Sequence, residues 1–97
     1  MMKHHITKGS VFDDLGFVTE EAQNLKIRAA LMAAIEEEIS KRKLTQVKAA
    51  ELLGITQPRL SDLMRGKIQL FTIDALVNML VKLNVHVSLV IDHHLAA

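Results

Sequence analysis

The chain has 97 residues, an apolar fraction of 49% and a net charge of +1. This length supports one domain, residues 1–97, and leaves no room for a second independent core. The absence of cysteine excludes disulfides, thiolate zinc sites and cysteine nucleophiles. No apolar run approaches the ~20 residues that span a bilayer, and residues 1–5 lack the apolar stretch of a signal peptide. We therefore expect a cytoplasmic protein that does not enter a membrane.

Positive charge is concentrated in one stretch of the chain. Residues 41–67 contain seven basic and two acidic side chains, a net charge of +5, whereas residues 1–40 carry −3 and residues 68–97 carry −1. A surface that contacts nucleic-acid phosphates requires such a concentration. This stretch is therefore the first candidate for a functional site.

The N-terminal segment, residues 1–18, is predicted to be an arm followed by a short helical turn. Ser10 can cap the turn, and Gly16 ends it. Its apolar side chains include Phe12, Leu15 and Phe17. Two interpretations stay open: these side chains complete the core over the first long helix, or they form a surface for a partner protein.

Four helices are predicted over residues 19–84. The first begins at the cap Thr19 and ends at the basic Lys41-Arg42-Lys43, and its apolar stripe comprises Ala22, Leu25, Ala29, Met32, Ile35 and Ile39. The next three begin at the caps Thr45, Thr56 and Thr72 and end near Gly54, Gly66 and Asn84. The apolar positions expected inside these three are Val47, Ala49, Ala50, Leu52 and Leu53, then Leu60, Leu63 and Met64, then Ile73, Leu76, Val77, Leu80 and Leu83.

The C-terminal segment changes to a period of two. Residues 85–91 alternate and are rich in β-branched side chains, which predicts a strand. Because a lone strand leaves its backbone unpaired, we expect it to pair with the same strand of a second subunit across a two-fold axis. The side chains expected at this homodimer contact are Val85, Val87, Leu89 and Ile91.

The pattern from Gln46 to Arg65 predicts a helix-turn-helix. Two short helices joined by a few residues need a small residue at their closest approach, here Ala50, and a turn residue free to take positive φ, here Gly54. Leu60 and Leu63 are placed to fill the junction. Such helices also occur in ordinary bundles, but the combination with a basic stretch favours DNA binding.

The segment LTQVKAAELLGITQPRLSDLMRGK resembles the helix-turn-helix of the Xre family, the lambda-repressor-like domains. The flanking segments GSVFDDLGF and FTIDALVNMLVKLNVHVSLVI resemble a narrower group of small bacterial Xre-type antitoxins and regulators (HigA-like). The resemblance implies an all-α bundle of four main helices, with a short N-terminal helical turn and a C-terminal strand that pairs in a dimer.

In such domains the third helix enters the major groove by its N-terminal end. The resemblance implies base-reading roles for Gln57, Arg59, Ser61 and Asp62, and phosphate contacts for Gln46, Thr56, Arg65 and Lys67. A carboxamide at Gln57 suits adenine, and a guanidinium at Arg59 suits guanine. Asp62 has an alternative role as a local ion pair with Arg59 or Arg65. Pro58 replaces the more usual polar residue.

The expected function is a sequence-specific repressor that binds a palindromic operator as a homodimer, with half-sites about 34 Å apart. The resemblance also implies the antitoxin of a type II pair that binds a RelE/HigB-like toxin and represses its own operon. The alternative is an Xre-fold protein-interaction module that does not bind DNA. No nucleophile has a base near it in sequence, so we expect no enzyme and no cofactor. The histidine pairs His4-His5 and His93-His94 lie in the terminal segments and predict no metal site.

Overall fold

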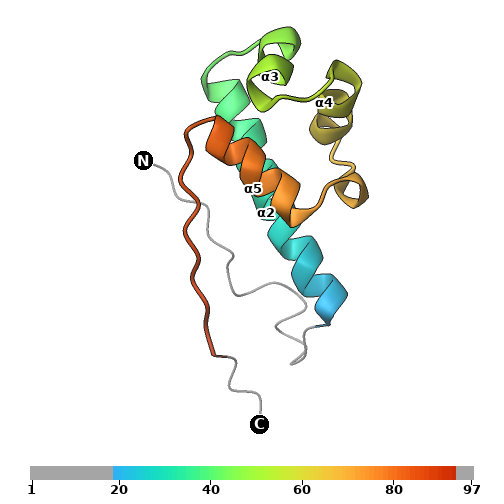
Figure 1. The fold of residues 1–97 in the computed structure, drawn as a ribbon. Helices are drawn as coiled ribbons and strands as arrows, with labels where there is room; N and C mark the ends of the chain where they lie inside the picture. The colour runs from blue at the N-terminus through green and yellow to red at the C-terminus, as the bar shows by residue number, and fades with distance from the viewer. Residues whose placement is uncertain (1–18, 94–97) are drawn as a thin grey trace.

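The computed structural model describes residues 19–93, which form four α-helices, a short 3-10 helix and a C-terminal segment. The elements in order are α2 (Glu20–Lys41), α3 (Gln46–Leu53), α4 (Gln57–Met64), η1 (Ile68–Leu70) and α5 (Ile73–Lys82). α5 packs along α2, and α3 and α4 lie together at one end of this pair (Figure 1). The all-α class and the four main helices predicted from the sequence are confirmed.

Each α-helix begins at a threonine whose hydroxyl oxygen accepts a hydrogen bond from the backbone N–H three residues later. The distances from Thr19, Thr45, Thr56 and Thr72 are 3.0, 3.1, 3.3 and 3.1 Å. Each bond satisfies one of the N–H groups that a helix start leaves without a partner. The four caps therefore fix where the helices begin, and they agree with the sequence prediction.

Each α-helix also ends in the same way, at a residue with left-handed backbone. At the end of α3, the N–H of Gly54 donates to the carbonyl of Glu51 at 3.1 Å, and the N–H of Ile55 donates to that of Ala50 at 3.0 Å, which is the Schellman arrangement. The left-handed residues are Lys43 (φ 52°), Gly54 (70°), Gly66 (75°) and Asn84 (60°). Glycine and asparagine suit this conformation, whereas lysine does not.

Lys43 is therefore a position where glycine should stabilise the protein. A left-handed L-residue costs roughly 1–2 kcal/mol, and the larger entropy loss of glycine offsets roughly 0.5–1 kcal/mol of that. We expect Lys43→Gly to raise the free energy of unfolding by about 0.5–1 kcal/mol, measured by urea denaturation. Gly54→Ala is the matched opposite, and it should lower the same quantity by about 1–2 kcal/mol. A loss of stability in both variants would contradict this account.

The core is aliphatic and draws on all four α-helices. Phe71, between η1 and α5, is its one aromatic side chain within residues 19–93 and is 2% exposed. The other core side chains are Met32, Ala34, Ile35 and Ile39 of α2, Ala49, Ala50 and Leu53 of α3, Leu60 and Leu63 of α4, and Leu76, Met79, Leu80 and Leu83 at α5.

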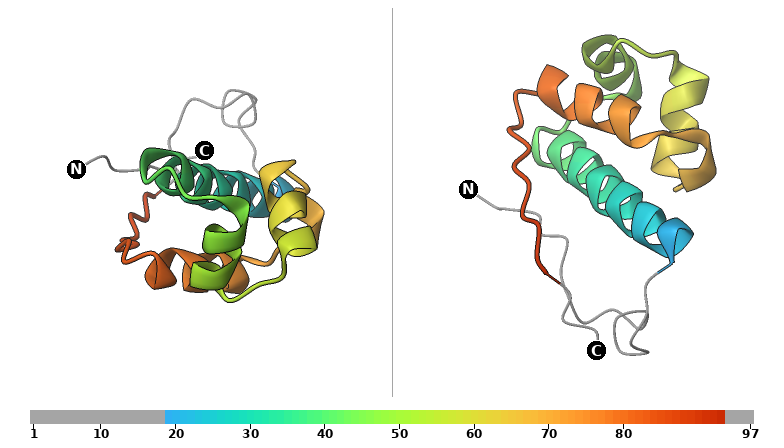
Figure 2. Two further views of the ribbon diagram at one scale, coloured as in Figure 1. Left: turned by 90° about the horizontal axis from the view of Figure 1, so that it is seen from above. Right: turned by 60° about the horizontal axis from the view of Figure 1, so that its bottom comes forward.

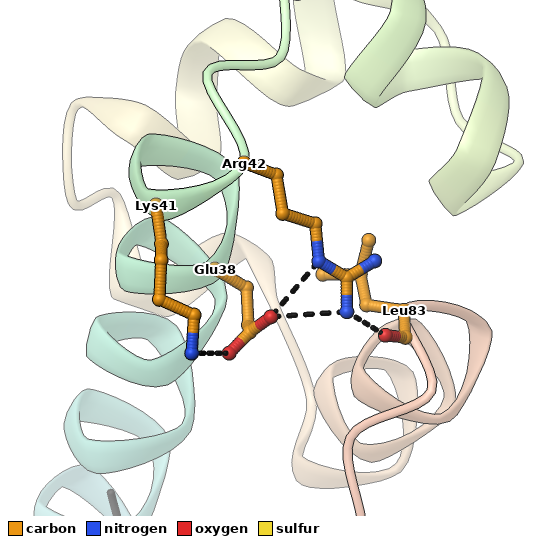
Figure 3. Close-up of polar contacts among 4 residues, drawn as sticks. All are labelled: Glu38, Lys41, Arg42 and Leu83. Carbon is orange, nitrogen blue, oxygen red and sulfur yellow. Dashed lines mark hydrogen bonds and ion pairs between the residues drawn. The ribbon is translucent and has the colours of Figure 1, made fainter. Parts of the chain in front are cut away.

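The C-terminal ends of α2 and α5 are joined by Arg42. Its guanidinium pairs with Glu38 at 3.0 Å, and it donates to the backbone carbonyl of Leu83 (Figure 3). Lys41 also pairs with Glu38, at 3.3 Å. Arg42 therefore stabilises a contact between residues 41 positions apart, in addition to placing positive charge at a helix end as the sequence predicts.

Several apolar positions predicted to be inside are not. Val47 is 54% exposed, and Leu52 and Met64 are each 39% exposed. In α2, Ala29 is exposed and Leu25 is only partly buried. α3 and α4 have two turns each, so their buried face is narrower than the set of apolar residues they carry.

The strand predicted over residues 85–91 is not formed, and residues 19–93 contain no strand. The segment leaves α5 without regular secondary structure and runs away from α3 and α4 (Figure 2). Val85 and Val87 pack against the core, whereas Leu89 and Ile91 are 69% and 82% exposed. A strand needs a partner for its backbone, and the helices of this single chain offer none.

The 3-10 helix η1 was not predicted from the sequence. Its position is fixed from a distance, because Nη1 of Arg28 on α2 donates to the carbonyl of Ile68 at 2.9 Å. The predicted N-terminal turn with Phe12, Leu15 and Phe17 lies outside the described residues. No helix of the described chain is both long and apolar enough to cross a membrane.

Candidate nucleic-acid interface

The turn between α3 and α4 has the geometry of a helix-turn-helix. Ala49 and Ala50 are 0% and 4% exposed, which lets α3 approach its neighbours closely. Gly54 supplies the left-handed turn residue, and Ile55 packs against the core beyond it. Thr56 then caps α4. Three residues thus separate two eight-residue helices and fix their relative orientation.

α4 is held by a few buried side chains and presents polar ones. Leu60 and Leu63 are 1% and 0% exposed, so they anchor the helix against the rest of the domain. Gln57 is exposed in the first turn. Pro58 follows it in the first turn of the helix. Backbone N–H groups there have no partner inside the helix, so the missing N–H of proline costs no hydrogen bond. The N-terminal end of α4 is therefore capped, held by two buried leucines and accessible to a ligand.

Unlike Gln57, Arg59 contacts an aromatic ring. Its guanidinium carbon is 4.4 Å from the centre of the Phe71 ring, a cation–π contact, and the residue is partly buried. The Phe71 ring therefore holds the Arg59 side chain at the surface of α4. The sequence did not reveal Phe71 as a residue of this site, because the contact joins α4 to a loop twelve residues later and leaves no local pattern.

Asp62 is engaged in a local ion pair, but with neither Arg59 nor Arg65. Its carboxylate is 3.3 Å from Nζ of Lys67, and its backbone carbonyl accepts from the N–H of Lys67 at 3.1 Å. The alternative that named those two arginines as its partner is therefore wrong. Ser61, beside it, is partly buried.

The residues expected at the DNA backbone lie at element ends. Gln46 is the first residue of α3 and is exposed, and Thr56 is the exposed cap of α4. Arg65 is exposed after α4, and 43% of the Lys67 side chain is exposed in spite of its ion pair. The first N–H groups of a helix have no partner inside the helix and favour anions. This arrangement can bind phosphates at two helix starts and one helix end.

Part of the positive charge of residues 41–67 is neutralised by ion pairs within the protein. Arg42 and Lys41 are committed to Glu38. Within residues 19–93, Lys43 and Arg65 are exposed and take part in no ion pair. The positive charge that remains for a ligand thus lies next to the two short helices.

Comparison with protein families gives one finding. A family model described as a helix-turn-helix domain matches residues 11–92, most of the chain, including all the helices described above. The comparison with curated proteins gives no match.

Proposed function

Because this chain belongs to the helix-turn-helix domain family, we propose that it is a sequence-specific DNA-binding transcriptional regulator whose helix α4 reads bases in the major groove. The observation that carries this proposal is the N-terminal end of α4. There, an exposed Gln57 stands on a helix that is capped by Thr56 and anchored by the buried Leu60 and Leu63. A rigid polar helix start is what major-groove reading requires.

The residues divide into base readers and phosphate contacts. Gln57 offers an acceptor and donors for adenine, and Arg59, stacked on the Phe71 ring, offers two N–H donors for guanine. Ser61 and Asp62 are proposed as secondary readers. Gln46, Thr56, Arg65 and Lys67 are proposed to contact phosphates, which fix the register on DNA. The polar surface of α4 favours DNA over the alternative, a protein-interaction module without DNA binding.

Selection of binding sites from a pool of random DNA duplexes tests the function. We expect one enriched motif with two-fold symmetry, because a dimer places two α4 helices on successive turns of the groove. The affinity for that motif should fall steeply with salt concentration, because phosphate contacts release counterions. Failure to enrich any motif, with the protein folded, would contradict sequence-specific binding.

We propose further that the regulator is a homodimer joined by residues 85–91. An apolar hollow of about 450 Å³ lies between α5 and this segment, lined by Val77, Val81, Val85 and Val87 with Asn84 and His86. Leu89, Val90 and Ile91 continue its apolar surface and are 69–82% exposed. Exposed apolar chain with a period of two favours pairing with the same segment of a second copy, which would also cover the hollow.

Leu89→Asp/Ile91→Asp should therefore convert a dimer into a monomer, measured by sedimentation equilibrium. Both side chains are exposed, so the melting temperature of the monomeric fold should change little. Ser88→Asp is the control, because in the proposed paired strand Ser88 would face away from Leu89 and Ile91, so the dimer should stay intact. A monomeric wild type, or a dimeric double variant, would contradict the proposed contact.

A narrower role is proposed on the resemblance of the flanking segments: a cytoplasmic antitoxin that represses its own operon and binds a RelE/HigB-like toxin. Phe12, Leu15 and Phe17 are the proposed toxin surface. Co-expression with the product of the adjacent gene tests this role. We expect the two proteins to form a complex that survives purification. Phe12→Ser/Phe17→Ser should disrupt this complex and leave DNA binding unchanged.

A further inference from the structure

Lys82 connects α5 to the turn of the helix-turn-helix. It is the last residue of α5, and its Nζ donates to the backbone carbonyl of Leu53, the last residue of α3, at 3.3 Å. The two residues are 29 positions apart. The function proposed above assigns no role to Lys82.

The Leu53 carbonyl is one that the end of α3 does not satisfy by itself. The Schellman arrangement uses the carbonyls of Ala50 and Glu51 and leaves the last carbonyls of the helix free. The carboxyl end of a helix also carries partial negative charge. An ammonium group therefore binds here with both a hydrogen bond and a favourable dipole.

Lys82 is itself held in place. The next residue, Leu83, is 0% exposed, and its carbonyl accepts from Arg42, which Glu38 holds at 3.0 Å (Figure 3). A Cβ built at Gly54 would lie 2.8 Å from Nζ of Lys82, so the ammonium lies directly over the turn. In addition to the packing of Leu53 and Ile55, the turn is thus hydrogen-bonded through the Lys82 side chain to the end of α5.

We propose that Lys82 is a positioning residue for DNA recognition: its bond to Leu53 fixes the turn before α4 and so the angle at which α4 presents Gln57. The inference rests on the proposed function, since it concerns how that site is oriented. Lys82 need not touch DNA to act in this way. Its effect should therefore fall on specific binding, which depends on the exact orientation of α4, and not on non-specific binding.

Lys82→Met tests this role, because methionine keeps an apolar stem and removes the donor. We expect a roughly 3- to 10-fold loss of affinity for the selected motif, with the affinity for unrelated DNA and the salt dependence of binding unchanged. Lys82→Arg, which can still donate to Leu53, should recover most of the loss. Asn78→Met is the control: it places the same residue at another exposed polar position of α5, one without a hydrogen bond to the turn.

Hydrogen exchange without DNA gives a second measurement. The N–H groups of Gly54 and Ile55 should exchange several-fold faster in Lys82→Met, while those in the middle of α2 stay unchanged. Unchanged exchange at the turn, or equal motif affinity in Lys82→Met and wild type, would overturn the proposal. An equal loss on all DNA with a shallower salt dependence would also overturn it, since that is the signature of a phosphate contact. A wild type without a preferred motif would instead refute the proposed function, and the exchange result would still decide whether Lys82 holds the turn.

Discussion

Gln57→Ala/Arg59→Ala should abolish the preference for the selected DNA motif while leaving a folded protein that still binds DNA weakly. A bidentate contact between a side chain and a base contributes about 1–3 kcal/mol of discrimination. The loss of two such contacts should therefore lower the affinity for the motif by about 100-fold. Binding to unrelated DNA should fall far less, because phosphate contacts supply it. A mobility-shift titration at two salt concentrations measures both quantities.

The single variants should separate the two side chains. Gln57 is exposed in the first turn of α4, so its removal should leave the stability of the fold within about 0.5 kcal/mol of wild type. Arg59→Ala also removes the contact with Phe71, and we expect it to lower the free energy of unfolding by about 0.5–1 kcal/mol. Gln57→Ala is therefore the cleaner test of base reading.

Two control variants complete this experiment. Gln69→Ala removes an exposed amide on η1 and should leave DNA binding unchanged. Arg65→Ala should weaken binding to all sequences by a similar factor and make the salt dependence shallower by about one unit, as a phosphate contact predicts. If the double variant keeps the motif preference of the wild type, α4 is not the reading helix.

The helices could be predicted because their ends are encoded locally. A threonine cap and its bonded N–H are three residues apart, and Gly54 and Asn84 lie where a left-handed residue is needed. The buried positions of α4 follow from one turn of helix between Leu60 and Leu63. These signals fit within a few residues of sequence, so periodicity and residue type were sufficient to find them.

The features that the sequence did not predict join distant residues. Arg42 bonds the carbonyl of Leu83, and Lys82 bonds that of Leu53; both acceptors are backbone atoms, which any residue type supplies. The stack of Arg59 on Phe71 likewise depends on how the chain returns after η1. The sequence therefore suggests candidate residues for the site, whereas the contacts that orient them could not be predicted from it.

The predicted strand at residues 85–91 failed for a different reason. An alternating pattern indicates that a segment favours extended backbone, but it does not show which strand the segment pairs with. The pattern is compatible with a strand, yet a strand forms only where another edge accepts its hydrogen bonds. The described chain provides no such edge, so the segment is irregular from Val85 onward. The same alternation is what supports the proposed pairing with a second copy.

Phe71→Ala should destabilise the fold more than Arg59→Ala or Gly54→Ala. The ring is 2% exposed and lies in the core between η1 and α5, and Phe→Ala changes at such positions cost about 3–5 kcal/mol. A domain of this size has a total stability of about 5–10 kcal/mol, so a large fraction of the variant should be unfolded at about 37 °C if the wild type lies at the lower end of that range. Thermal denaturation followed by circular dichroism measures the effect.

Leu70→Ala is the matched control for Phe71, because Leu70 is the preceding apolar residue and is 45% exposed. It should cost no more than about 0.5 kcal/mol. Phe71→Leu separates the two functions of the ring, since leucine fills much of the core volume but offers no π face to Arg59. We expect Phe71→Leu to remain folded and to bind the motif more weakly than its stability alone explains. Equal motif affinity in Phe71→Leu and wild type would show that Arg59 reaches DNA without the support of the ring.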